Sequence, residues 1–121
     1  MVSNKRTSED AVKIVLKKLR RKGVEAIEIK AKKGYDIRAK SRYIEVKGTR
    51  QSFKNKVFFL ITKGEREAIR RHKNYCIYWV DTKNKKIVAK INRKYIVNNL
   101  KPHESYYLYL STLKQKLKRV N

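Results

Sequence analysis

Residues 34–48 read GYDIRAKSRYIEVKG, and this stretch decides how the chain folds. Apolar residues alternate with polar ones on both sides of Lys40 and Ser41. Because successive side chains of a strand point to opposite faces, this alternation predicts two strands that each have one apolar face. We therefore expect a hairpin with strands at about 35–39 and 43–47.

The register of this hairpin brings two acids together. Only a pairing that keeps the apolar residues of both strands on one face can bury them, and a short connection then sets Asp36 opposite Glu45. Directly opposed side chains have Cβ atoms about 4.5–5.5 Å apart, so both carboxylates can share one divalent ion. Lys47 lies two residues beyond Glu45, on the same face. An ammonium there can stabilise a developing hydroxide and a pentacovalent phosphate.

Electrostatics favour an ion between the two acids. At about 5 Å and an effective dielectric near 20, their repulsion is roughly 3 kcal/mol before surface solvation reduces it. A chain with 34 lysines and arginines but only 10 acids has easy ways to avoid that contact. The alternative is that Glu45 and Lys47 form an ordinary exposed ion pair, worth less than about 1 kcal/mol. We predict a metal site, with Asp36 and Glu45 as its ligands.

A helix is expected before the hairpin, over roughly 8–22. Thr7 or Ser8 is the predicted N-cap, acids fill the first turn, apolar residues follow at helical spacing, and Gly23 is the natural stop. The cap and the glycine set the limits of this helix.

Glu9 is the candidate third acid of the site. On a helical wheel it falls at the border of the apolar stripe, whereas Asp10 points further out. An acid at that border can reach over the sheet and join the catalytic and metal-binding residues. The alternative is that Glu9 only complements the helix dipole and pairs with Lys13 four residues later.

The rest of the chain predicts an α/β fold with a central mixed sheet flanked by helices. Thr62 and Glu65 have the spacing of a capping box, which opens a helix that runs to about His72. Further strands are expected at 24–30, 57–61, 75–80, 86–91 and 106–110, and the basic C-terminal segment has apolar residues at helical spacing.

Length and charge limit the function. We interpret the 121 residues as one domain, with a core at about 8–91 and a C-terminal strand and basic tail at 92–121. A formal charge of +24 indicates a polyanionic partner, most simply DNA.

There is no apolar run long enough to span a membrane and no signal peptide, so we expect a soluble cytoplasmic protein with no membrane partner. The single cysteine, Cys76, excludes a disulfide framework and is expected to be a buried strand thiol.

The hairpin residues resemble the PD-(D/E)XK nuclease superfamily, which has an acid on one strand and Glu-x-Lys on the next. More closely, GYDIRA and RYIEVKG, followed by FFLITKGE, are similar to the domain at the C-terminus of NO VEIN proteins, over about residues 8–91. This resemblance implies a restriction-endonuclease-like fold and phosphodiester hydrolysis that depends on Mg²⁺ or Mn²⁺. It would make Asp36 and Glu45 the metal ligands, with Glu9 matching the helix acid and Lys47 orienting or activating the attacking water.

Three other functions stay open. A basic nucleic-acid binder without catalytic activity needs the charge alone, and a nuclease-fold adaptor in a defence or repair assembly needs no catalysis. A Holliday-junction-resolvase-like enzyme would share the core, and exposed strand edges are compatible with a homodimer. For any of these, the expected nucleic-acid contacts near the hairpin are Lys32, Lys33, Arg38, Arg42, Thr49, Arg50, Lys54 and Lys56.

Overall fold

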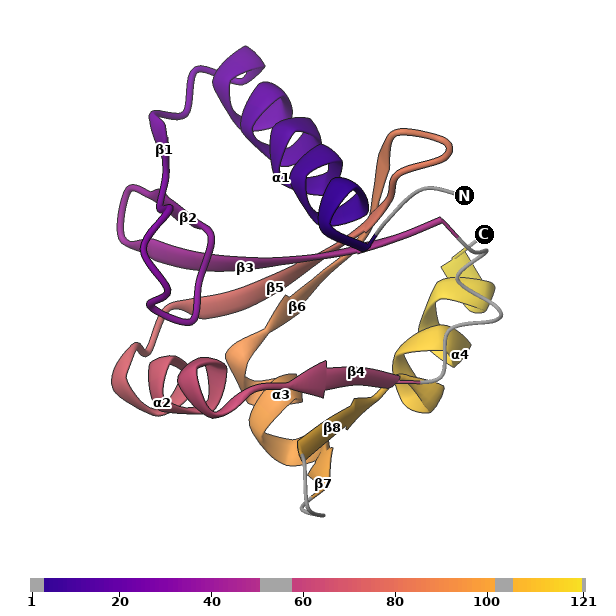
Figure 1. The fold of residues 1–121 in the computed structure, drawn as a ribbon. Helices are drawn as coiled ribbons and strands as arrows, with labels where there is room; N and C mark the ends of the chain where they lie inside the picture. Colours follow the sequence, from indigo (N-terminus) through magenta and orange to yellow (C-terminus); the bar gives the residue numbers. More distant parts are fainter. Residues whose placement is uncertain (1–3, 51–57, 102–105, 121) are drawn as a thin grey trace.

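The structure is a computed structural model that describes residues 4–50, 58–101 and 106–120 of the chain. In these residues it contains two sheets and four helices (Figure 1). The helices are α1 (Asn4–Arg21), α2 (Lys63–Arg71), α3 (Arg93–Asn99) and α4 (Ser111–Val120). The strands are β1 (Ala26–Glu28), β2 (Ile37–Ala39), β3 (Arg42–Thr49), β4 (Phe58–Ile61), β5 (Tyr75–Asp81), β6 (Lys86–Asn92), β7 (Leu100–Lys101) and β8 (Tyr106–Tyr109).

The central sheet is mixed, as the sequence predicts. Its five strands lie in the order β1-β2-β3-β5-β6, and the second sheet has the order β4-β8-β7. Neighbouring strands of the central sheet are antiparallel, except that β3 and β5 are parallel. The α/β class with flanking helices is therefore confirmed.

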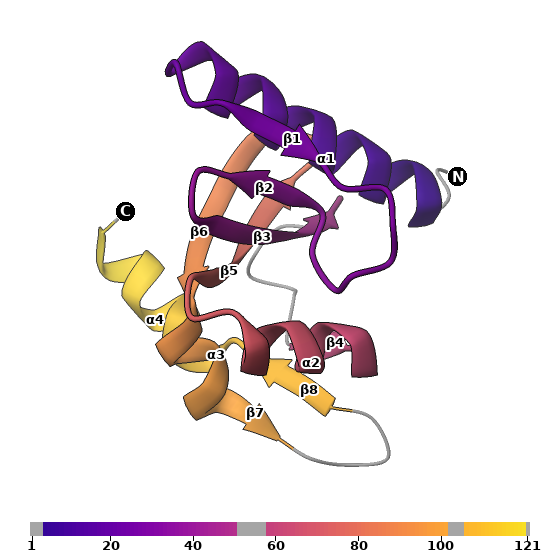
Figure 2. The same cartoon turned by 90° about the vertical axis from the view of Figure 1, so that its left-hand side faces the viewer.

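Each face of the central sheet is covered by its own apolar core. On one face, α1 packs through Val15 against Ile37 and Ile44 of the hairpin. On the other face, Trp79 lies in a second core to which α2, α3 and β8 contribute, for example through Ile96 of α3. Figures 1 and 2 show α1 on one side of the sheet and the remaining helices with the second sheet on the other. Residues of β3 that point away from α1 therefore face α2.

The hairpin has the predicted register. Ile37 pairs with Ile44 and Ala39 with Arg42, which leaves a two-residue connection. Its first residue, Lys40, has a φ of 55°, in the left-handed region that tight hairpins require. The chain provides this conformation without the Asn-Gly or Asp-Gly pair that usually does so.

The predicted start of α1 is wrong. The helix already includes Asn4, so Thr7 and Ser8 lie inside it and do not cap it. Its end is as expected. Gly23 has a φ of 76°, and the amide of Val24 donates to the carbonyl of Leu19, which is one of the hydrogen bonds typical of a helix that ends at a glycine.

The structure adds two elements that the sequence analysis did not predict, helix α3 and the short strand β7. The side chain of Asn92 accepts a hydrogen bond from the Tyr95 amide at 2.8 Å and so caps α3 directly after β6. A strand that continues into a capped helix without a turn signal hides the boundary from sequence analysis. No helix within the described ranges is long and apolar enough to cross a bilayer.

Candidate metal and catalytic site

Three charged side chains meet between the central sheet and α2. Nζ of Lys47 lies 3.2 Å from Oε2 of Glu45, two residues earlier on β3. The same Nζ donates to both carboxylate oxygens of Glu65 on α2, at 3.0 and 2.7 Å, and to the carbonyl oxygen of Leu60 at 3.3 Å. The predicted placement of Glu45 and Lys47 on one face is confirmed, and Glu65 is an additional member of the cluster.

Glu65 is held in place by the start of its own helix. Thr62 is the N-cap of α2: its hydroxyl accepts from the Glu65 amide at 3.1 Å, and its amide donates to Oε1 of Glu65 at 2.9 Å. The predicted capping box is therefore present. The carboxylate that completes this box also contacts Lys47, so a local helix signal positions a side chain in the site.

The loop before Asp36 lies against the first turn of α2. Gly34 has a φ of 86°, and a Cβ there would clash with the carbonyl of Gly64. The hydroxyl of Tyr75 on β5 donates to the Gly34 carbonyl at 2.8 Å and ties this loop to the central sheet. A residue larger than glycine would push α2 away, and Glu65 with it.

Asp36 lies at the end of the hairpin, one position before β2. Its amide donates to the carbonyl of Ile44 at 2.8 Å, and its Oδ2 accepts from the amide of Val46 at 2.8 Å. The paired ladder ends at Ile37 and Ile44, so Asp36 precedes the last paired residue of β2 and Glu45 follows that of β3. The negative charge of Asp36 acts on Glu45 and contributes to raising its pKa. The predicted proximity of these two acids is thus present.

The acids of the cluster have opposite pKa shifts. Burial raises the pKa of Glu45 well above its usual value, and its hydrogen bond with Glu65 and that residue's negative charge raise it further. Burial alone would also raise the pKa of Glu65, but its hydrogen bonds with Glu45 and Lys47 and the positive charge of Lys47 hold the pKa below the usual value. Glu45 therefore carries a proton more readily than Glu65 does.

Lys47 stays positively charged in this setting. Burial alone would lower its pKa, but the carboxylates of Glu45 and Glu65 outweigh that effect and raise the pKa above the usual lysine value. A raised pKa makes the ammonium a stable donor and a poor proton acceptor at neutral pH.

A cavity of about 460 Å³ opens beside Asp36, and Glu9 lines it. Glu28 of β1 and Lys13 of α1 line the same cavity. Glu9 itself is exposed, whereas Asp10 is only partly exposed, so the expectation that Asp10 points further out is wrong. Glu9 and Asp36 therefore border one space, although Glu9 does not belong to the buried cluster around Lys47.

The basic residues predicted to contact nucleic acid lie in different parts of the structure. Lys32 and Lys33 line a cavity of about 370 Å³ together with Arg71 of α2. Arg38 shares the sheet face of Glu45 by register, and its guanidinium lies 5.0 Å from the centre of the Tyr43 ring.

Two of the predicted contacts do not flank the site. Arg42 is on the opposite face of the sheet, where it donates to the hydroxyl of Tyr78 at 2.8 Å, because even-numbered residues of β3 face α1. Thr49 is buried, and its hydroxyl accepts from the Trp79 indole at 3.2 Å. Arg50 is exposed directly after β3. Lys54 and Lys56 lie outside the described residues.

The donor set suits a hard divalent cation. In the described residues, no group of three or more histidine, cysteine, aspartate or glutamate side chains is arranged to hold a metal ion. Mg²⁺ needs fewer protein ligands, because it keeps several waters and commonly binds one or two carboxylates together with substrate phosphates. Asp36 and Glu45 provide these oxygen ligands. Burial is the main cause of the raised pKa of Glu45, and the negative charges of Glu65 and Asp36, which a cation would offset, raise it further.

Sequence reasoning used Glu65 only as a helix cap. A second signal was available: Glu65, Ala68 and Ile69 form the buried face of α2, and a glutamate in that position needs a charged partner inside the protein. Lys47 is that partner, 18 residues earlier in the chain.

Comparison with known proteins defines the family. The chain matches the model of the family described as Protein NO VEIN, C-terminal, over residues 8–96. The match covers well over half of the 121 residues, so the chain belongs to this family. No significant match was found among curated proteins or among solved structures.

Proposed function

We propose that this protein is a metal-dependent nuclease of the PD-(D/E)XK type that hydrolyses phosphodiester bonds in DNA. The observation that carries the proposal is the 3.2 Å contact of Lys47 with Glu45, with Asp36 close enough for its charge to act on Glu45, in a chain with a formal charge of +24. The positive surface would attract a polyanion, while Asp36 and Glu45 lie where a bound cation could contact the phosphate of that polyanion.

In this proposal Asp36 and Glu45 hold Mg²⁺ or Mn²⁺. A bound divalent ion would neutralise charge on the scissile phosphate and acidify an attacking water. Asp36 is already oriented, since its Oδ2 accepts the amide of Val46. Glu45 would bind the ion as a carboxylate, and a nearby cation would lower the pKa that burial raises. Glu9 borders the cavity beside Asp36 and is the outer acid of the site.

Lys47 orients the water and stabilises negative charge on the phosphate. The raised pKa of Lys47 supports this role and not that of a general base. A general base must be unprotonated to accept a proton, and a raised pKa keeps the lysine protonated. Glu65 positions the ammonium through two oxygens. A water-excluded position strengthens the effect of this charge on the transition state.

A cleavage panel tests the proposal. Supercoiled, linear, single-stranded and four-way-junction DNA are each incubated with Mg²⁺, Mn²⁺ or EDTA. We expect cation-dependent cleavage by the wild type, and loss of cleavage with binding retained in Asp36→Asn and Lys47→Ala. Glu25→Gln, an exposed acid outside the site, is the matched control and should cleave normally. The substrate that is cut fastest also separates a junction resolvase from a general nuclease.

A second candidate is a nucleic-acid binder without catalytic activity. Lys47 is already paired with two carboxylates, an arrangement that also serves to fasten α2 to the central sheet. Binding of every DNA substrate, with no cleavage under any cation, would establish this function and overturn the nuclease.

A further inference from the structure

We propose that a cavity between α2 and α3 binds a backbone phosphate of single-stranded nucleic acid together with the nucleoside next to it. The cavity has a volume of about 370 Å³, within the range of small-ligand sites. This site is separate from the cluster around Lys47, and the proposal does not rest on hydrolysis.

The outer face of α2 provides three of the cations. Lys63, Arg66 and Arg70 are spaced by three and four residues, which places them along one side of the helix. Glu65 belongs to the buried face of the same helix. One helix therefore holds the Lys47 cluster on one side and presents a row of positive charges on another.

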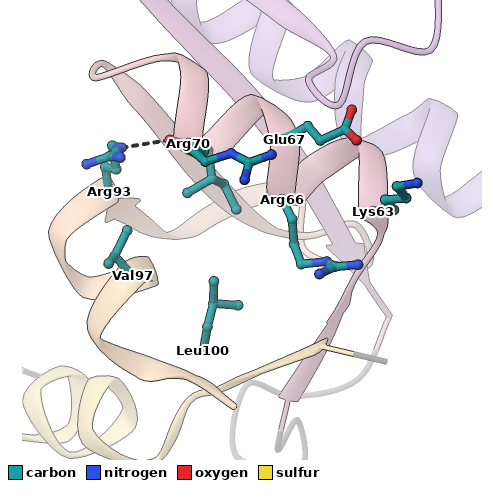
Figure 3. Close-up of a pocket in the computed structure, with 8 residues that line it drawn as sticks. Lys63, Arg66, Glu67, Arg70, Arg93, Val97 and Leu100 are labelled. Atoms are coloured by element: carbon teal, nitrogen blue, oxygen red, sulfur yellow. Dashed lines mark hydrogen bonds between the residues drawn. The ribbon is translucent and has the colours of Figure 1, made fainter. Parts of the chain in front are cut away.

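Arg93, the first residue of α3, provides the fourth cation. Its Nε donates to the carbonyl of Ile69 in the last turn of α2 at 2.7 Å (Figure 3). This bond uses one of the five N–H groups of the guanidinium and fixes its plane at the cavity wall. A preorganised guanidinium loses little side-chain freedom when it binds a phosphate.

Charge defines the anionic part of the ligand. The cavity lining contains four cations and one acid, Glu67. In Figure 3 the carboxylate of Glu67 points away from Val97 and Leu100, so it does not neutralise the space between the two helices. A phosphate can accept hydrogen bonds from several of these groups, and arginine matches its geometry with two parallel bonds.

Apolar side chains define the rest of the ligand. Val97 and Leu100 face α2 from the other side of the cavity, and Val97 is 47% exposed. A phosphate alone would leave this wall in water, whereas an unpaired nucleoside can cover it. In a duplex the bases are stacked inside the helix, so the combination favours a single strand.

The test compares two double variants of equal charge. Arg66→Gln/Arg70→Gln alters the cavity, and Lys17→Gln/Arg21→Gln removes two exposed charges from α1, across the central sheet. Fluorescence anisotropy of a labelled single-stranded oligonucleotide is measured in EDTA at several salt concentrations.

We expect the cavity variant to lose about tenfold in affinity and its salt dependence to fall by roughly one phosphate contact. The fold loss in affinity of the control variant should be less than half that of the cavity variant. Should the double variant fail to fold, Arg70→Gln alone, at an exposed position, is expected to lose about threefold. Equal losses in the cavity and control variants would overturn the proposal.

Two further measurements identify the ligand. Val97→Asn should weaken oligonucleotide binding severalfold but leave binding of inorganic phosphate, followed by amide chemical shifts of α2 and α3, unchanged. If a free mononucleotide saturates the cavity while oligonucleotide affinity is the same in the wild type and the Arg66→Gln/Arg70→Gln variant, the cavity is a small-molecule site and the proposal fails.

Discussion

Glu65 of α2 and Lys47 of β3 form the closest ion pair of the cluster, with Nζ 2.7 Å from Oε2. The side chains are largely buried, at 17% exposed for Lys47 and 8% for Glu65. Burial makes this pair sensitive to the loss of either partner, because the remaining charge would lie in a poorly solvated place. The pair also joins helix and sheet, so stability and the geometry of the proposed site depend on the same contact.

Replacing Glu65 by glutamine should weaken this contact and keep the helix cap. Glutamine at the third helical position still completes a capping box, but it lacks the charge that holds Lys47. We expect a loss of about 1 to 2 kcal/mol in the free energy of unfolding, measured by urea denaturation, and a slower cleavage rate. Glu25→Gln, an exposed acid outside both the site and the cavity, is the control. A Glu65→Gln variant as stable and active as Glu25→Gln would show that Glu65 does not position Lys47.

Divalent cations should stabilise the wild-type protein. A ligand that binds only the folded state raises its stability by RT ln(1 + [L]/Kd), which is about 2.7 kcal/mol at a concentration one hundred times Kd. We expect the melting temperature to rise with Mg²⁺ or Mn²⁺ in the wild type and in Glu25→Gln, but not in Asp36→Asn. Equal shifts in all three proteins would place the cation elsewhere.

The pKa of Glu45 predicts how stability changes with pH. A carboxyl group whose pKa is raised on folding stabilises the protein below its unfolded pKa, and that contribution is lost as the pH rises through the folded value. The loss should therefore begin above 4.5, the ordinary glutamate value. Glu65 has the opposite effect. Because its pKa is lowered on folding, its contribution to stability is present above 4.5 and is lost as the pH falls from 4.5 through the lowered pKa.

Glu45→Gln isolates the first of these effects. The amide does not titrate, so the stability of the variant relative to the wild type should increase as the pH is raised from 4.5 towards neutral. Urea denaturation at a series of pH values measures this difference. A difference that stays constant across the series would mean that Glu45 ionises at its ordinary pKa.

Cys76 should be an unreactive thiol. Burial raises its pKa to about 11, although the positive charges of Arg42 and Lys90 act in the other direction. At pH 8 only about one molecule in a thousand would carry the reactive thiolate. Thiol titration of the native protein should therefore be slow and become fast in denaturant. Cys76 is only partly buried, whereas the sequence predicts a buried thiol, and rapid labelling of the native protein would contradict its raised pKa.

Local patterns were sufficient for the hairpin and for helix α2. The alternation around Lys40 predicts which residues are buried, and burial leaves one register that sets Asp36 near Glu45. The capping box predicts the start of α2 because Thr62 and Glu65 contact each other within one turn. Local signals misplaced the start of α1, where capping residues occur inside a longer helix.

The sequence by itself determined the two-faced hairpin, the proximity of its two acids and the large positive charge, since these depend on near neighbours or on composition. Only the tertiary structure decided that Glu65 reaches Lys47, that Arg42 turns to the opposite face, and that Arg93 joins the cations of α2. These contacts link residues 18, 36 and 24 positions apart. Their geometry follows from how helices pack on the two faces of the sheet, and no short-range pattern carries that information.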